Sequence, residues 1–260
     1  MNDNAEATKK KPLILVTNDD GVGSDGLMAL YEAMKEIADT VVVAPDRERS
    51  ATSHSLTMHR PLKVVEVQRN VYTVNGTPTD CVAIGLEKIL RRTPALLASG
   101  INRGGNLGDD ITYSGTVSAA IEGTLMGVPS FAISVAGEGG YIFKTAAAFA
   151  KKIAMIILRK GLPKDTLLNI NVPNLPEGDL AGVKFTKQGK RVYKNAIHET
   201  FDPWGRQHYW IGGGTPSWED DEDTDFLAVE SRCISISPIH LDLTNYDALS
   251  CIKREWKSLF

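Results

Sequence analysis

Short apolar runs alternate with amphipathic segments along the first two thirds of the chain. The apolar runs are rich in branched side chains, which is typical of buried strands, and they cover residues 13–16, 41–44, 94–98, 128–135 and 167–173. Between them, apolar positions recur at helical spacing in residues 27–38, 77–90, 117–126 and 141–158. Strands that alternate with helices form β-α-β units with right-handed crossovers. The pattern therefore predicts an α/β fold around a mostly parallel sheet.

The first strand ends in an unusual concentration of charge. Residues 13–16 are followed at once by Asn18, Asp19, Asp20 and Gly21. Adjacent carboxylates repel each other, so the pair favours either free solvent or a bound cation. Ligands of open α/β sheets bind at the carboxyl ends of the strands, and Mg²⁺ and Mn²⁺ prefer oxygen ligands. A divalent metal site is one interpretation, and an Asp-Gly turn that caps the next helix is the other.

A glycine pattern typical of dinucleotide-binding loops follows the same strand, namely Gly21, Gly23 and Gly26. Asp46 follows roughly 20 residues later, where such folds place an acidic residue against the ribose. An NAD-dependent oxidoreductase is therefore an alternative. Against it, Asp19, Asp20 and Asp25 would surround a pyrophosphate that needs N–H groups and positive charge.

Two later loops offer further polar groups at strand ends. Residues 45–57 contain Ser50 together with Arg47 and Arg49, which suit a metal or a phosphate ester, although a solvated loop would have the same composition. Residues 99–116 form a long stretch rich in glycine and asparagine before the helix at 117–126. Its last residues, Ser114-Gly115-Thr116, place hydroxyls and free N–H groups at a helix start, which predicts either a phosphate site or a simple helix cap.

Composition narrows the class of protein. The chain has 260 residues with a formal net charge of -3, which argues against a dedicated nucleic-acid-binding surface. The 3 cysteines form no Cys-x-x-Cys pair, so a reducing cytoplasm is expected. Residues 1–11 are polar and predict a disordered tail, and no apolar run approaches the roughly 20 residues of a membrane span. We expect a single domain over residues 12–260.

The composition changes after Pro176. Residues 183–214 predict an extended arm, because Trp204, Tyr209 and Trp210 stand among glycines without helical spacing. Aromatic residues on such a segment suit an interface with another chain. The acidic run at 219–225 predicts a solvated loop, residues 234–239 a strand and residues 246–260 a helix.

Together these motifs resemble one family, the SurE (survival protein E) nucleotidases. The resemblance covers nearly the whole chain. It rests on Asn18-Asp19-Asp20-Gly21, Ala44-Pro45-Asp46 with Ser50, Gly76-Thr77-Pro78-Thr79-Asp80-Cys81-Val82, Ser99-Gly100-Ile101-Asn102, Asn106-Leu107-Gly108, Tyr113-Ser114-Gly115-Thr116-Val117, Glu122-Gly123, Leu168-Asn169-Ile170-Asn171-Val172-Pro173, Asp225 and Ser237-Pro238.

The resemblance implies a metal-dependent phosphatase of nucleoside 5′- and 3′-monophosphates. Its metal ligands fall on Asp19, Asp20, Ser50 and Asn106, which implies one Mg²⁺ or Mn²⁺ per subunit and a catalytic role for the two aspartates. Its phosphate-binding residues fall on Asn106, Ser114, Gly115 and Thr116. Ala51 departs from the family pattern, which usually has glycine after the ligand serine.

The resemblance also implies a Rossmann-like three-layer α/β/α sandwich with a protruding C-terminal β-hairpin arm, used to form a homodimer or homotetramer. The two alternatives to the nucleotidase are the NAD-dependent oxidoreductase and a nucleotide sensor without catalysis.

Overall fold

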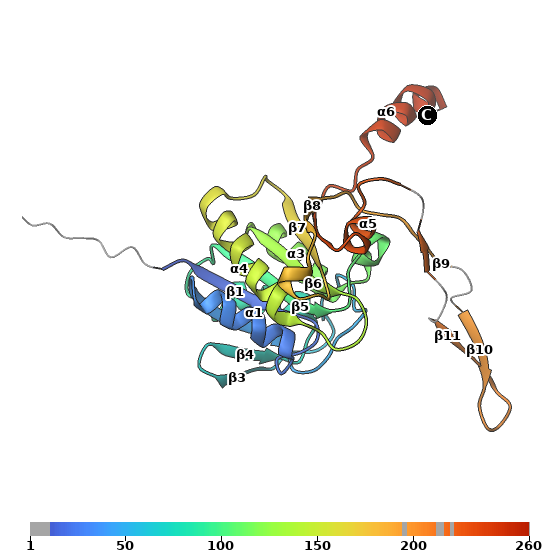
Figure 1. Cartoon of the computed structure of the whole chain (residues 1–260). Helices are drawn as coiled ribbons and strands as arrows, with labels where there is room; N and C mark the ends of the chain where they lie inside the picture. Colours follow the sequence, from blue (N-terminus) through green and yellow to red (C-terminus); the bar gives the residue numbers. More distant parts are fainter. Residues whose placement is uncertain (1–10, 194–196, 212–215, 219–220, 260) are drawn as a thin grey trace, which may run out of the picture.

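A nine-stranded sheet forms the centre of the molecule, a computed structural model that describes residues 11–193, 197–211, 216–218 and 221–259. The strands lie in the order β3-β4-β2-β1-β5-β6-β7-β13-β8. They span Leu13–Thr17 (β1), Asp39–Pro45 (β2), Val64–Gln68 (β3), Val71–Val74 (β4), Leu96–Arg103 (β5), Ser130–Ala136 (β6), Thr166–Pro173 (β7), Gly182–Phe185 (β8) and Cys233–His240 (β13). Figure 1 shows this body with a hairpin and a helix extending away from it.

The strands from β4 to β7 run parallel, whereas β3 at one edge and β13 near the other are antiparallel to their neighbours β4 and β7. The chain builds the sheet outward from β1 through β2 to β4 and then returns to the other side of β1 to form β5. This reversal places a topological switch point between β1 and β5, where ligands of open α/β sheets bind.

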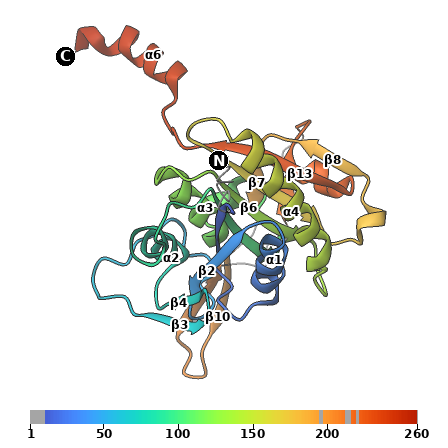
Figure 2. The ribbon, with the colours of Figure 1, turned by 90° about the vertical axis from the view of Figure 1, so that its left-hand side faces the viewer.

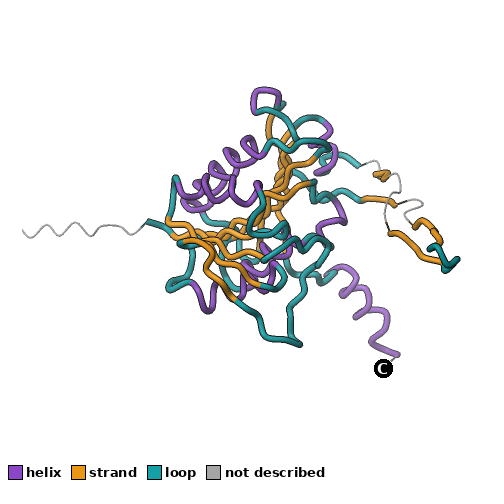
Figure 3. Tube along the Cα trace, turned by 90° about the horizontal axis from the view of Figure 1, so that it is seen from below, coloured by secondary structure: helices purple, strands orange, loops and turns teal. Residues whose placement is uncertain are grey.

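Helices cover both faces of the sheet. Figure 2 shows α1 (Asp25–Lys35) and α4 (Phe143–Lys160) on one side and α2 (Pro78–Ile84) and α3 (Gly115–Leu125) on the other. The side chains of β1 alternate accordingly, because Ile14 and Val16 join the apolar cluster under α1 and α4 while Leu15 joins the cluster under α2 and α3. Figure 3 shows the same three layers from below. The predicted mostly parallel α/β/α sandwich is confirmed.

Two predicted boundaries differ from the structure. The strand predicted at 94–98 continues to Arg103, and a 3₁₀ helix, η2 (Gly108–Thr112), follows it, so the loop before α3 is shorter than expected. The helix predicted at 77–90 is divided into α2 and a π-helical turn, η1 (Gly85–Ile89). Its start agrees with the sequence, because Thr77 and Asp80 cap it reciprocally and Pro78 is its first residue.

The C-terminal part of the chain extends away from the central sheet after β8 and again after β13. Residues 183–185 of the predicted arm lie in β8, beside β13, and the part further out consists of β9 (Arg191–Tyr193) paired with β12 (Pro216–Trp218) and of the hairpin β10 (Ile197–Phe201) and β11 (Gln207–Ile211). The remaining elements are η3 (Glu177–Asp179), α5 (Asp225–Glu230), α6 (Tyr246–Trp256) and η4 (Lys257–Leu259).

The prediction of a solvated loop at 219–225 is wrong for its last residue. Asp225 is fully buried and begins α5, because its carboxylate serves backbone N–H groups of two other segments. Residues 1–10 of the predicted tail lie outside the described residues. In the described part of the chain, no helix is both long and apolar enough to cross a membrane.

Candidate active site

A cavity of about 570 Å³ opens at the carboxyl ends of β1 and β5, at the switch point of the sheet. Five of the seven residues predicted for metal or phosphate binding lie in its wall, and Gly115 and Thr116 do not line it. The lining residues are Asp19, Asp20, Glu48, Ser50, Ala51, Asn102, Arg103, Gly105, Asn106, Asp110, Tyr113, Ser114 and Tyr141. Three loops that are distant in sequence therefore converge on one space.

Asp19 is held from behind by the start of α3. The side chain is 6% exposed, and the hydroxyl of Thr116 donates a short hydrogen bond to its Oδ1. Gly115 makes this approach possible, because a Cβ there would lie 2.8 Å from the Cβ of Asp19. Burial, with a smaller contribution from the neighbouring Asp20, raises the pKa of Asp19 to about 6, although the Thr116 hydrogen bond opposes the shift.

One carboxylate oxygen of Asp20 has a hydrogen-bond partner, and the other has none among the described residues. Nη2 of Arg103 lies 3.3 Å from Oδ1. Oδ2 is buried and accepts no hydrogen bond from any residue that the structure describes. Burial raises the pKa of Asp20, and the charge of Arg103 limits the rise. A buried carboxylate oxygen without a donor is costly in a folded protein, and a cation would satisfy it.

Asn106 is fixed by a buried amide network at the far wall. Its backbone N–H donates to Oδ1 of Asn171 at 2.8 Å, and its carbonyl accepts from the side chains of Asn169 and Asn171. Its own Nδ2 donates to the hydroxyl of Ser134 at 2.8 Å. Because the amide nitrogen is turned toward the core, the opposite side-chain oxygen is available to the cavity.

Ser50 lies on a loop that is fastened at both ends. Before it, the N–H of Arg49 donates to the carbonyl of Asp19 at 2.7 Å, and after it, the N–H of Ser53 donates to the carbonyl of Tyr113. The hydroxyl of Ser50 donates to Glu48 at 2.6 Å. Ala51 adopts a φ of +54°, a left-handed conformation that favours glycine, so the departure from the family pattern retains the backbone path at some cost.

The start of α3 supplies the phosphate-side wall. Ser114 caps the helix, and its hydroxyl accepts from the N–H of Val117 at 3.1 Å. Because Ser114 both caps this 11-residue helix and lines the cavity, the positive end of the helix dipole faces the cavity beside Asp19. Thr116 differs from the expectation, because its buried hydroxyl is used by Asp19 and does not line the cavity. Thr116 therefore contributes to the site by orienting the carboxylate of Asp19.

These donors fit a hard divalent cation. Two carboxylates, a hydroxyl and an amide oxygen are all oxygen ligands, and one of the carboxylate oxygens lacks any other partner in the described structure. Among the described residues, no group of three or more His, Cys, Asp and Glu side chains is placed to hold a metal ion.

Comparison with known proteins now identifies the family. The family model for survival protein SurE matches residues 14–195. The chain belongs to the SurE family.

Its relatives are similar over nearly their whole length. The 5′-nucleotidase SurE of Geobacter sulfurreducens is 55% identical over 241 residues, which cover 92% of both chains. The 5′-nucleotidase SurE of Moorella thermoacetica is 48% identical over 239 residues, covering 90% of this chain and 92% of the relative. The crystal structure of the SurE protein from Aquifex aeolicus superposes with a TM-score of 0.83 at 45% identity, covering 94% of this chain and 99% of that chain.

The sequence patterns of this SurE chain do not identify the arginine side chain that lines the cavity. Arg47 and Arg49 were the basic candidates, but neither lines the main cavity, and the guanidinium of Arg49 contacts Asp46 and the carbonyl of Asn75. The lining guanidinium belongs to Arg103, with Asn102 beside it. Both are the last residues of β5, the strand next to β1, a position at the ligand-binding edge of the sheet that the predicted strand at 94–98 does not reach.

The glycine pattern of the NAD alternative lies beside a different space. Gly21 and Gly23 line a smaller cavity of about 270 Å³, together with Asp20, Asp25 and Asp46. Arg47 and Arg103 also line this space, but three carboxylates outnumber the two guanidiniums, which disfavours a pyrophosphate. Neither the NAD-dependent oxidoreductase nor the sensor is supported by the SurE relatives.

Proposed function

We propose that the chain is a metal-dependent 5′-nucleotidase that hydrolyses nucleoside 5′-monophosphates, and also 3′-monophosphates, to the nucleoside and phosphate. The observation that carries this proposal is the buried aspartate pair at the end of β1, with one unsatisfied carboxylate oxygen, facing the start of α3. The relatives named 5′-nucleotidase SurE, about half identical over nearly the full chain, support the substrate class.

Asp19, Asp20, Ser50 and Asn106 would hold one Mg²⁺ or Mn²⁺ ion. A cation bound by them would act as a Lewis acid on the phosphoryl oxygen. The protein groups supply the rest. Thr116 keeps the Asp19 carboxylate oriented, and the start of α3 offers backbone N–H groups and a positive dipole end to the phosphate.

Arg103 would neutralise the charge that phosphate brings to the cavity. Its guanidinium is about half exposed and lies 3.3 Å from Asp20. A positive charge at this distance can exchange between the carboxylate and a phosphoryl oxygen as charge develops during the reaction. Ser114, at the opposite wall, would donate its hydroxyl hydrogen to a phosphate oxygen, because that hydroxyl already accepts the N–H of Val117.

Phosphate release tests the function directly. A panel of nucleoside 5′- and 3′-monophosphates is incubated with the purified chain in Mg²⁺, in Mn²⁺ and in chelator. We expect release with a cation and none in chelator. Nucleotide binding without release would favour the sensor, and NAD binding with hydride transfer would favour the oxidoreductase.

We also propose that the whole of residues 12–260 forms one domain and that the arm joins two or four copies of the chain. The support is its exposed aromatic residues, since Trp204 is 78% exposed and Tyr209 and Trp210 are 60% and 68% exposed. A cytoplasmic location stays a prediction from the cysteine content.

A further inference from the structure

Asp225 is a buried carboxylate that does not line the active-site cavity. Its Oδ2 accepts the N–H of Gly108 at 2.8 Å, and its Oδ1 accepts the N–H groups of Gly189 at 2.9 Å and of Phe226 at 2.9 Å. Gly108 begins η2, which separates Asn106 from Ser114 in the cavity wall, and Gly189 lies just before β9 at the base of the arm. One side chain therefore joins the active-site wall to the arm.

The two joined backbones also touch directly. The side-chain amide of Gln188 donates to the carbonyl of Gly108 at 3.0 Å. Gly108 has a φ of +54°, and a Cβ there would lie 2.8 Å from the carbonyl oxygen of Gly189 and 2.8 Å from the ring of Trp218. Gly108 is thus enclosed by groups from the arm base and needs to be glycine.

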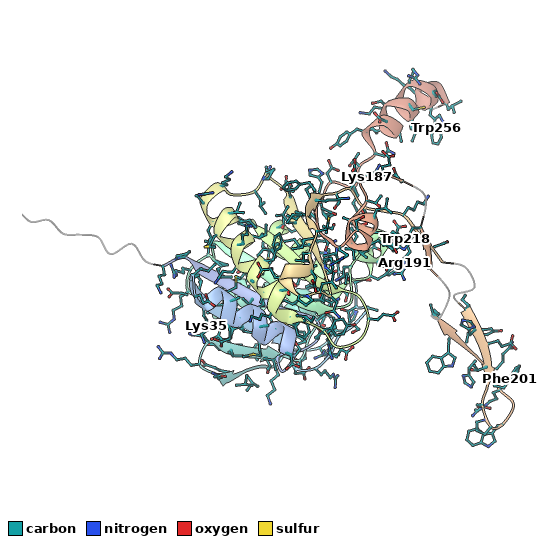
Figure 4. All side chains as sticks on the ribbon, viewed as in Figure 1. Lys35, Lys187, Arg191, Phe201, Trp218 and Trp256 are labelled. Atoms are coloured by element: carbon teal, nitrogen blue, oxygen red, sulfur yellow. The ribbon has the colours of Figure 1, made fainter. Side chains whose placement is uncertain are left out.

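A second contact joins the base of the arm to the middle of η2. Arg191 of β9 donates a short hydrogen bond to Asp110, which lines the cavity. Its guanidinium carbon lies 5.5 Å from the ring centroid of Trp218 of β12, and Trp218 stacks on Phe226 of α5 at 4.1 Å between centroids. Figure 4 shows Arg191 and Trp218 together beside α5, away from Phe201 on the hairpin.

We propose that Asp225, with Gln188, Arg191 and Trp218, forms a clamp that positions η2 and thereby the phosphate-binding turn at Ser114. These four residues are positioning residues, and the inference rests on the proposed nucleotidase function. A buried carboxylate costs free energy unless its hydrogen bonds are complete, so its use at this junction ties the geometry of η2 to that of the arm base. The aspartate pair follows β1, which is anchored between β2 and β5, and Thr116, which orients Asp19, lies within α3 and not in η2.

If the clamp positions η2, its loss should affect phosphate binding and metal binding differently. Loosening η2 should weaken phosphate binding more than the metal response. The amide network holds Asn106 independently of η2, and Thr116, which orients Asp19, is buried within α3. In Asp225→Asn, the side-chain amide would turn a donor toward one of the N–H groups that the carboxylate now serves. We expect the KM for AMP and the inhibition constant of inorganic phosphate to rise about tenfold, and the half-saturating Mn²⁺ concentration to change less than twofold.

Glu230→Gln, on the exposed end of the same helix, is the matched control and should behave as wild type. A second control removes residues 197–211, the hairpin outside the clamp, and should leave the inhibition constant of inorganic phosphate within twofold. If Asp225→Asn does not fold, Arg191→Gln carries the test at the partly exposed end, with an expected rise of about threefold.

Amide hydrogen exchange tests the clamp without depending on enzymatic turnover. We expect the segment around Gly108 to exchange at least about tenfold faster in Asp225→Asn than in wild type. A folded variant with unchanged exchange, KM and phosphate inhibition would overturn the clamp. Equal losses in the phosphate and Mn²⁺ responses would also overturn it, since they indicate a general loss of structure. Absence of phosphate release by the wild type would instead reject the nucleotidase function, and exchange alone would then decide the clamp.

Discussion

The Asp19 wall and the arm hairpin represent two kinds of structure in one chain. Asp19 is buried against Thr116 and Gly115, nearly 100 residues later in the sequence, so its position is fixed by the core. The residues of β10 and β11 are all exposed, and the contacts within the hairpin are local, such as Arg206 with Asp202 at 2.7 Å and over the ring of Trp204 at 5.3 Å.

This difference suggests that the Asp19 wall serves catalysis and that the hairpin serves association between chains. A change in the Asp19 wall displaces a group proposed to bind the metal ion, and the close-packed core transmits the displacement. A change in the hairpin removes apolar surface that the chain itself does not bury, so its effect should fall on association. The following predictions test this division from its strongest consequence to its weakest.

We expect Asp19→Asn to lower kcat by at least about a thousandfold while the protein stays folded, because a bound cation is worth several kcal/mol at the transition state. Phosphate release from AMP in saturating Mn²⁺ measures the loss, and circular dichroism checks the fold. Asp25→Asn, at the start of α1 on the same edge of the sheet, is the control and should retain most of the activity. Near-normal turnover of Asp19→Asn would exclude this metal site.

Gly115→Ala should lower kcat/KM by about ten- to a hundredfold. The added Cβ would lie 2.8 Å from the Cβ of Asp19, so either the carboxylate or the start of α3 has to move. Gly23→Ala is the matched control, because no heavy atom lies within 4 Å of its new Cβ. Equal kinetics for the two variants would mean that the α3 start does not set the position of Asp19.

The extent to which the sequence predicts these features follows the same division. The strand at 13–16, the aspartates behind it and the helix starts at 77 and 114 are local patterns, and the structure agrees with them. The role of Thr116, the guanidinium of Arg103 and the burial of Asp225 depend on contacts between segments distant in sequence. An acidic residue at the end of an acidic run gives no local sign that distant N–H groups will surround it.

Metal should stabilise the native state by several degrees. A ligand that binds only the folded chain adds about 2.7 kcal/mol at a hundredfold excess over its Kd. We expect the Tm of the wild type to rise with Mn²⁺ and that of Asp20→Ala to rise much less, since the variant lacks the unsatisfied oxygen. Differential scanning fluorimetry measures both. Equal shifts would place the metal elsewhere.

The metal-free protein should lose stability as the pH rises from about 4 to above 6. Burial raises the pKa of Asp19 to about 6 from 3.8, so the folded state holds a proton that the unfolded state releases. Stability is therefore greatest below the unfolded pKa and falls as Asp19 ionises. In chelator, Asp19→Asn should melt a few degrees above wild type at pH 7.5 and close to it at pH 4. An unchanged difference between the two pH values would assign the effect to another group.

The hairpin should determine the oligomeric state and have little effect on the rate of phosphate release. We expect the intact chain to be at least a dimer, because its exposed apolar hairpin would be unusual on a monomer, and Ile211 of this surface is 89% exposed. Replacing residues 194–214 with a short glycine bridge should give monomers while Asp19, Asp20, Ser50 and Asn106 stay in place. Light scattering at micromolar concentration measures the mass, and phosphate release in Mn²⁺ should change by less than about threefold if β9 and β12 still hold η2. A wild-type chain that is already monomeric would show that the hairpin serves no self-association, whereas a monomer with a large loss of turnover would show that assembly shapes the cavity and that the division drawn above fails.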